Sequence, residues 1–137
     1  MKAKPKIGTA GEQQFVVEAM HAIDFAHDRM PAVLSTPWLI WFLEHAAREA
    51  ILPLLDPGES TVGTLVEVRH LAATPVGQTV RCVARVVQTD SQVISFQLEA
   101  RDEHEVIGRG FHKLRVINMD RFAARVRAKQ RNPNARQ

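Results

Sequence analysis

Three polar residues in the first half of the chain could together carry out chemistry on an acyl group. Thr36 and Glu44 stand eight residues apart, at the two ends of the most apolar run in the sequence. His70 follows within a stretch whose pattern is typical of a β-strand. A hydroxyl, a carboxylate and an imidazole can supply the base and the proton route for acyl transfer or hydrolysis, with either the Thr36 hydroxyl or a water molecule as the nucleophile. We therefore interpret the chain as an enzyme that acts on an acyl derivative.

Each of these residues also has a structural explanation that requires no chemistry. Thr36 before Pro37 is a common start of a helix, where the hydroxyl caps free backbone N–H groups. Glu44 could form an ion pair with Arg48, one helical turn later. His70 could be a strand-end histidine that bonds to the backbone. A carboxylate on an apolar helix face, however, costs several kcal/mol unless it has a partner, and this favours a functional Glu44.

Two further histidines are expected to have no catalytic role. His45 lies about 100° around the helix from Glu44 and is expected to point elsewhere. His112 falls on the apolar face of a predicted strand, and we expect a core histidine whose ring nitrogens are satisfied.

The apolar run itself predicts a long, buried helix. Thr36 suits the N-cap, and Pro37 suits the first helical position, where no N–H is needed. Pro53 predicts an end of the helix near Leu52. Because the first half is apolar almost all round, Trp41 is expected in the core.

From residue 61 onward, the apolar pattern changes to a period of two, which is typical of strands. The predicted strands cover residues 61–70, 79–89, 92–101 and 106–117, and a weaker alternation predicts a first strand over residues 14–20. Short turn-like links separate the last three, so neighbouring strands should pair as an antiparallel meander. One buried helix and an antiparallel sheet predict an α+β domain.

The composition fits one globular domain over residues 1–137. The apolar fraction of 45% and charged fraction of 24% are ordinary for this class, and no apolar run approaches the roughly 20 residues that cross a bilayer. Residues 1–8 are expected to be a flexible, solvated leader and residues 128–137 a flexible basic tail. The single cysteine, Cys82, excludes an internal disulfide and is compatible with the cytoplasm. Without a CxxC motif or a His/Cys cluster, we expect no metal and no other cofactor.

The net charge of +3 comes largely from basic residues near the C-terminus. Such a cluster could bind nucleic acid, form a solvated helix, or attract a phosphate-bearing substrate such as coenzyme A. We favour the solvated helix, and expect neither nucleic acid nor a membrane as a partner.

Several short segments, spread over nearly the whole chain, carry a family resemblance. They are residues 35–37, 42–44, 56–59, 62–64, 70–77 and 107–112. In these segments, and most specifically over residues 55–77, the chain resembles the fluoroacetyl-CoA thioesterase family of hotdog proteins. The similarity extends from about residue 8 to residue 127.

The resemblance implies a hotdog fold, with the sheet wrapped around the helix, and hydrolysis of a small acyl-CoA in the cytoplasm. The family's catalytic threonine, glutamate and histidine correspond to Thr36, Glu44 and His70, and a glycine near the acyl group corresponds to Gly63. The resemblance also implies a homodimer, or a tetramer, with the site at the subunit interface. The other residues that we expect to bind substrate are Val33, Leu34, Pro37 and Arg115.

The chain departs from the family in two places. The family enzyme has an aromatic-rich lid before its threonine, whereas residues 28–34 contain no Phe, so fluoroacetyl specificity is not expected. Leu114 stands where the family has an arginine, and Arg115, one step further along, should point to the opposite face of its strand. Two other functions share this fold: a non-catalytic acyl-CoA binding module, and a dehydratase or hydratase that leaves the thioester intact.

Overall fold

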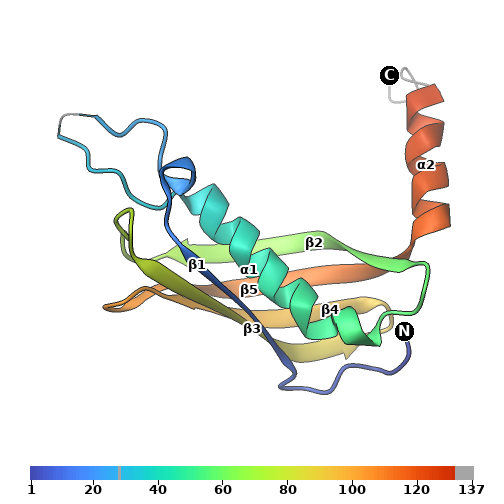
Figure 1. Ribbon diagram of the computed structural model, residues 1–137. Coiled ribbons are helices and arrows are strands. Elements are labelled where there is room, and N and C mark those ends of the chain that lie inside the picture. Colours follow the sequence, from blue (N-terminus) through green and yellow to red (C-terminus); the bar gives the residue numbers. More distant parts are fainter. Residues whose placement is uncertain (28, 132–137) are drawn as a thin grey trace.

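The computed structural model describes residues 1–27 and 29–131. In chain order the elements are β1 (Ala10–Val16), the 3-10 turn η1 (Ala19–His21), α1 (Thr36–Ile51), the 3-10 turn η2 (Leu52–Leu54), β2 (Glu59–His70), β3 (Thr79–Asp90), β4 (Val93–Arg101), β5 (Val106–Asn118) and α2 (Met119–Arg131). The five strands form one antiparallel sheet in the order β1-β3-β4-β5-β2, and α1 lies across one face of it (Figure 1). The predicted α+β architecture and the meander of the last three strands are confirmed.

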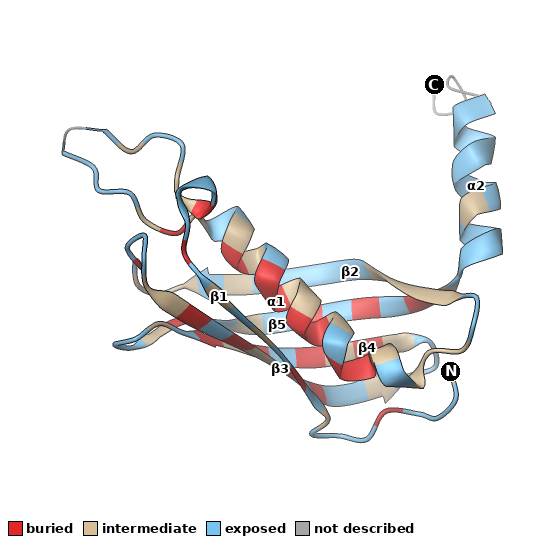
Figure 2. Ribbon diagram, in the orientation of Figure 1, coloured by how far each residue is buried: buried red, intermediate tan, exposed pale blue. Residues whose placement is uncertain are grey.

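The core lies between α1 and the face of the sheet that it covers. Residues with a period of two on β3, β4 and β5 are buried there, and the outward residues between them are mostly exposed (Figure 2). Phe96, Leu98 and Leu114 meet Leu39 and Leu43 of the helix in one continuous cluster. Burial of these side chains, at about 25 cal/mol per Å² of apolar surface, holds the sheet around the helix.

The start of α1 differs from the expectation in one respect that matters for the site. Ser35 is the N-cap, Thr36 is the first helical residue and Pro37 follows it. Ser35 makes no capping bond with its side chain. The hydroxyl of Thr36 is therefore free for a contact outside the helix.

Strand β1 begins earlier than the predicted 14–20 because its pattern is broken by a glycine. Gly11 crosses so close to α1 that a Cβ placed on it would lie 2.1 Å from the carbonyl oxygen of Ala46. Only glycine permits that approach. Because Gly11 occupies a buried position that would otherwise have an apolar side chain, the alternation of apolar and polar residues along β1 is weak.

Strand β2 forms one edge of the sheet. It pairs with β5 on one side, and its other side is open in the part of the chain that the structure describes. A bulge between Gly63 and Leu65 shifts the register. Residues 63–67 are all exposed, including Leu65 at 40% and Val66 at 45%. Such an apolar, unpaired edge is a place where another strand can add.

The structure describes contacts or a helix in parts of the two end segments, whose flexibility stays a prediction. In the predicted leader, Met1 packs against the core and the N–H of Lys2 bonds to the carbonyl of Leu54 at 2.7 Å. In the predicted tail, residues 128–131 continue α2, which projects from the sheet (Figure 1) with no buried residue. Residues 132–137 lie outside the described part. Within that part, no helix has the length and apolar character to span a membrane.

Candidate active site

The structure brings Thr36 and His70 together. Thr36 is the first residue of α1 and His70 is the last residue of β2, and the Thr36 Oγ and His70 Nδ1 atoms lie 2.8 Å apart. The pair is at the open end of the helix, where Thr36 is exposed and His70 is half-buried. This is the contact expected between a hydroxyl nucleophile and its general base.

The surroundings of His70 favour its neutral ring. Burial lowers the pKa of His70 below its ordinary value of 6.5, and among residues 1–27 and 29–131 no charged group offsets the loss of hydration. The other ring nitrogen, Nε2, is buried without a partner among the described residues. With the proton on Nε2, the Thr36 hydroxyl donates to Nδ1, and the ring is ready to accept that proton.

The N-terminus of α1 adds a site for negative charge beside this pair. The first N–H groups of a helix have no partner within it, and the helix dipole places partial positive charge there. A thioester carbonyl against Thr36 would develop its oxyanion at this point. The helix end therefore offers stabilisation of the kind that an oxyanion hole provides.

Glu44 belongs to a second cluster, with Gly63 and His112. A Cβ placed on Gly63 would lie 2.9 Å from Glu44 Oε1 and 3.3 Å from His112 Cε1, so both side chains close over the glycine. They face a cavity of about 150 Å³, which is lined by Glu44, His45, Arg48, Thr61, Gly63, His112 and Leu114. Any side chain at position 63 would displace the carboxylate.

The burial of Glu44 is less than we expected from the helical pattern. The residue is half-buried rather than deep in the core, and Trp41, expected in the core, is 44% exposed. Within residues 1–27 and 29–131, no ion pair joins Glu44 to Arg48. The purely structural explanation of Glu44 therefore has no contact to support it.

The two clusters lie far apart in one protomer. Thr36 and Glu44 are separated by eight helical residues, or about 12 Å along the axis at 1.5 Å each. Gly63 and His70 are seven residues apart in the strand, or roughly 23 Å at about 3.3 Å each. A single chain thus has a hydroxyl–imidazole pair at the C-terminal end of β2 and a carboxylate beside Gly63, in the first half of the strand.

The remaining residues expected to bind substrate lie around the first cluster or on the outer face. Leu34 is buried, and its N–H bonds to the carbonyl of Thr74 at 2.8 Å. Val33 is half-buried and bridges to Pro75, whereas Pro37 is exposed beside Thr36. Arg115 is exposed, and its strand position is adjacent to that of the buried Leu114, so it points away from the cavity.

His112 is the residue whose surroundings differ most from the sequence interpretation. It is buried, at 3% exposure, as expected for a core histidine, but neither ring nitrogen has a hydrogen-bond partner among the described residues. His21 is the contrasting case, because it is buried and its Nδ1 accepts the N–H of Glu18 at 3.0 Å. Alternation along β5 placed His112 on the inner face, but the pattern contained no information about partners.

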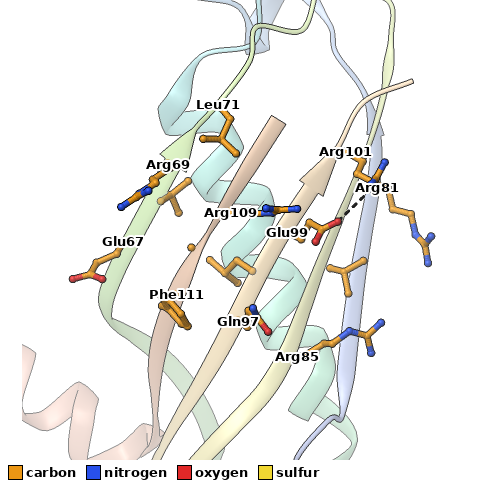
Figure 3. Close-up of a pocket in the computed structure, with 14 residues that line it drawn as sticks. Glu67, Arg69, Leu71, Arg81, Arg85, Gln97, Glu99, Arg101, Arg109 and Phe111 are labelled. Atoms are coloured by element: carbon orange, nitrogen blue, oxygen red, sulfur yellow. Dashed lines mark hydrogen bonds and ion pairs between the residues drawn. The ribbon is translucent and has the colours of Figure 1, made fainter. Parts of the chain in front are cut away.

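A larger hollow lies on the outer face of the sheet, away from both clusters. This groove has a volume of about 930 Å³ and carries five arginines at positions 69, 81, 85, 101 and 109 (Figure 3). Arg101 pairs with Glu99 at 3.2 Å, and Arg81 pairs with Glu12. The described residues that line the groove include no histidine and no residue with a side-chain hydroxyl.

Comparisons with known proteins agree on one family. The model described as fluoroacetyl-CoA-specific thioesterase matches residues 16–120. The fluoroacetyl-CoA thioesterase of Streptantibioticus cattleyicolor is 33% identical over a 137-residue alignment. The alignment covers 94% of this chain and 97% of that protein. A solved mutant of the fluoroacetyl-CoA-specific thioesterase FlK matches with a TM-score of 0.86 and 32% identity, over 93% of this chain and 99% of that chain.

Other solved structures extend the comparison. A Thermus thermophilus protein of the thioesterase superfamily matches with a TM-score of 0.87 and 30% identity, over 96% of this chain and 98% of that chain. Mutants of FlK have been solved with acetyl-CoA, and with fluoroacetate and CoA. A hot-dog-like protein from Thermanaerovibrio acidaminovorans, at 21% identity and a TM-score of 0.82, shares the fold. The predicted hotdog architecture is confirmed.

Proposed function

The chain belongs to the fluoroacetyl-CoA thioesterase family and is an acyl-CoA thioesterase, and on that premise we propose that it hydrolyses a small acyl-CoA at a site shared between two copies. The observation that carries this proposal is the 2.8 Å contact between Thr36 and His70, seven residues along β2 from Gly63, beside which Glu44 lies. A site that needs all three groups is incomplete in one protomer.

Pairing of two β2 edges would complete the site. In an antiparallel pair, the start of one strand lies beside the end of the other. The Gly63 end of one β2 then lies beside the partner's His70, and Glu44 approaches the partner's Thr36. The exposed Leu65 and Val66 are covered in the same step, as is expected of an edge strand that serves as an interface.

The outer face of the sheet is a less suitable surface for this pairing. Val87 of β3 is 41% exposed, so the outer part of the sheet also has an apolar side chain that a partner could cover. Each copy of the groove has five arginines and two glutamates, Glu67 and Glu99, so two copies would bring together surfaces with an excess of positive charge. Repulsion between like charges opposes that contact. We therefore assign the dimer interface to β2. A tetramer would need a second contact surface besides β2.

The reaction that this arrangement supports has two steps. Thr36 Oγ attacks the carbonyl carbon of the thioester while His70 takes the hydroxyl proton, the C–S bond breaks, and the CoA thiolate leaves with that proton. A water molecule then attacks the acyl-threonine ester while the partner's Glu44 accepts a proton from it. The free acid leaves, and the proton returns to Thr36.

The substrate and the compartment follow from the same proposal. CoA is the thioester carrier that the family uses, and we place the enzyme in the cytoplasm.

The thiol of Cys82 is buried, and burial raises its pKa to about 12. It is consequently a core side chain rather than a competing nucleophile.

A charge on the β2 edge should separate the two protomers. We expect wild-type protein to be a dimer in light scattering at micromolar concentration, and Val66→Lys to be a monomer with little thioesterase activity, because a lysine blocks strand addition. Val87→Lys is the matched control, since Val87 is similarly exposed but lies on β3. A wild-type protein that is a stable monomer, or a monomeric variant with full activity, would exclude the shared site.

We also propose that fluoroacetyl-CoA is not a privileged substrate. Residues 29–34 contain no Phe, and Met30 is 43% exposed in the loop that precedes Thr36; Asp28, the first residue of the predicted lid, lies outside the described residues. Rates of thiol release from fluoroacetyl-CoA, acetyl-CoA and propionyl-CoA should then be of similar order. A preference for the fluorinated substrate of about 10³-fold, or roughly 4 kcal/mol, would overturn this proposal.

A further inference from the structure

His112 is a buried polar side chain that the reaction described above leaves unused. Its ring is 3% exposed, and both nitrogens are without a hydrogen-bond partner among the described residues. An unpartnered buried polar group destabilises a fold. Retention of such a group is best explained by a bound molecule that satisfies it when the site is at work.

The space in front of His112 is suited to water. The cavity of about 150 Å³ is large enough for a few water molecules, each with a share of about 30 Å³. Its polar wall includes Glu44. A Cβ built on Gly63 would lie 2.9 Å from Glu44 Oε1 and 3.3 Å from His112 Cε1, so the two side chains are close together. The other charged or titratable groups at the cavity are His45 and Arg48, on the same helix as Glu44.

We propose that His112 and Glu44 together hold the water molecule that releases the acid. This inference rests on the proposed function, and assigns His112 as a positioning residue within it. The water donates one proton toward the Glu44 carboxylate and the other toward a bare ring nitrogen of His112. Its oxygen lone pair is then directed away from both groups and toward the acyl carbon.

The balance of the step follows from this geometry. The water oxygen bonds to the acyl carbon, one water proton passes to Glu44, and the bond from the acyl carbon to the Oγ of the partner's Thr36 breaks. The proton then returns to the Thr36 oxygen. His112 neither gains nor loses a proton in the step.

The charge state of His112 agrees with this role. Burial lowers the pKa of His112, and the nearby carboxylate of Glu44 opposes that shift only in part. A neutral imidazole has one nitrogen that accepts a hydrogen bond and one that donates. The accepting nitrogen holds the attacking water, and the donor can bind a second molecule in the cavity.

The test is a comparison of His112→Leu with His112→Gln, assayed with acetyl-CoA by thiol release. Leucine removes both unpartnered nitrogens, so Tm should stay the same or rise. Its kcat should fall by about 10²-fold. Because kcat/KM reports acylation alone in a two-step reaction, it should stay within about threefold. Glutamine keeps a donor and an acceptor, and should retain kcat within about tenfold.

His45→Leu is the matched control, since His45 lines the same cavity but its Nδ1 already lies 2.8 Å from the carbonyl oxygen of Trp41. We expect this variant to keep kcat within about threefold. The inference is overturned if His112→Leu keeps wild-type kcat, if its Tm falls sharply, or if His112→Gln is equally inactive. Equal losses of kcat and kcat/KM in the leucine variant alone would retain the water site but exclude the acyl-threonine. A wild-type protein that releases no thiol would instead refute the proposed function.

Discussion

Replacement of Glu44 by glutamine is expected to lower the turnover of short acyl-CoA substrates by about 10²–10⁴-fold while the fold stays intact. The amide keeps the shape of the carboxylate and its place over Gly63, but it cannot accept the proton of the attacking water. Thiol release should be measured together with Tm.

Glu49→Gln is the matched control for this variant. Glu49 lies on the same helix and is exposed, so its replacement should leave the rate unchanged. If Glu44 merely paired with Arg48, the glutamine variant would lose at most about 0.5 kcal/mol of stability and none of its activity. Near-wild-type turnover would therefore decide for that simpler explanation.

Replacement of His70 by alanine should cause a loss of similar size, about 10²–10⁴-fold, and should also change the pH profile. In the wild-type enzyme, the rate should rise with pH as the imidazole loses its proton, because only the neutral ring can accept the proton of Thr36. Burial lowers the pKa of His70, and by itself moves the ascending limb of the pH–rate profile below pH 6.5. The limb should be absent in the alanine variant.

The shared site adds a second expectation for the same profile. A carboxylate from the partner favours the charged imidazole and raises the pKa of His70, in opposition to burial. The limb should then lie at lower pH in Glu44→Gln than in the wild-type enzyme. His104→Ala, in an exposed turn, is the control. If the ascending limb persists unchanged without His70, the base is another group.

The two inactive variants can be used together to test where the site lies. In a mixture of Glu44→Gln and His70→Ala chains refolded together, about half of the dimers are hybrids. In a shared site, each hybrid has one site with both residues intact, so about a quarter of wild-type activity should return. If Glu44 and His70 acted within one chain, every site would keep a defect and no activity would return.

The sequence was sufficient for most of the fold because burial on one face leaves a local pattern. Each of the last three strands alternates between apolar and polar residues, and the structure places the apolar set against α1. Strand β1 was displaced in the prediction because Gly11, forced by the helix backbone, interrupts its alternation. The long helix was predictable from its apolar run and from the prolines at its two ends.

The site was less predictable because its geometry depends on contacts between distant segments. Residue types pointed to Thr36, Glu44 and His70, but spacing along the chain could not show that the hydroxyl meets the imidazole and that the carboxylate lies elsewhere. The exposure of Trp41 reflects the same limit, because a helical wheel cannot distinguish the core of one protomer from a surface awaiting a partner. His112 was interpreted as satisfied, since a pattern of burial does not report hydrogen bonds.

The bulge in β2 makes the length of this strand part of the active site. Residues an odd number apart in a regular strand point to opposite faces, yet Gly63 and His70, seven apart, both face the helix because the register shifts between Gly63 and Leu65. Loss of one residue from this stretch would turn either the glycine or the histidine outward without altering any side chain. The number of residues between Gly63 and His70 is thus a constraint on the site that is separate from the identity of their side chains.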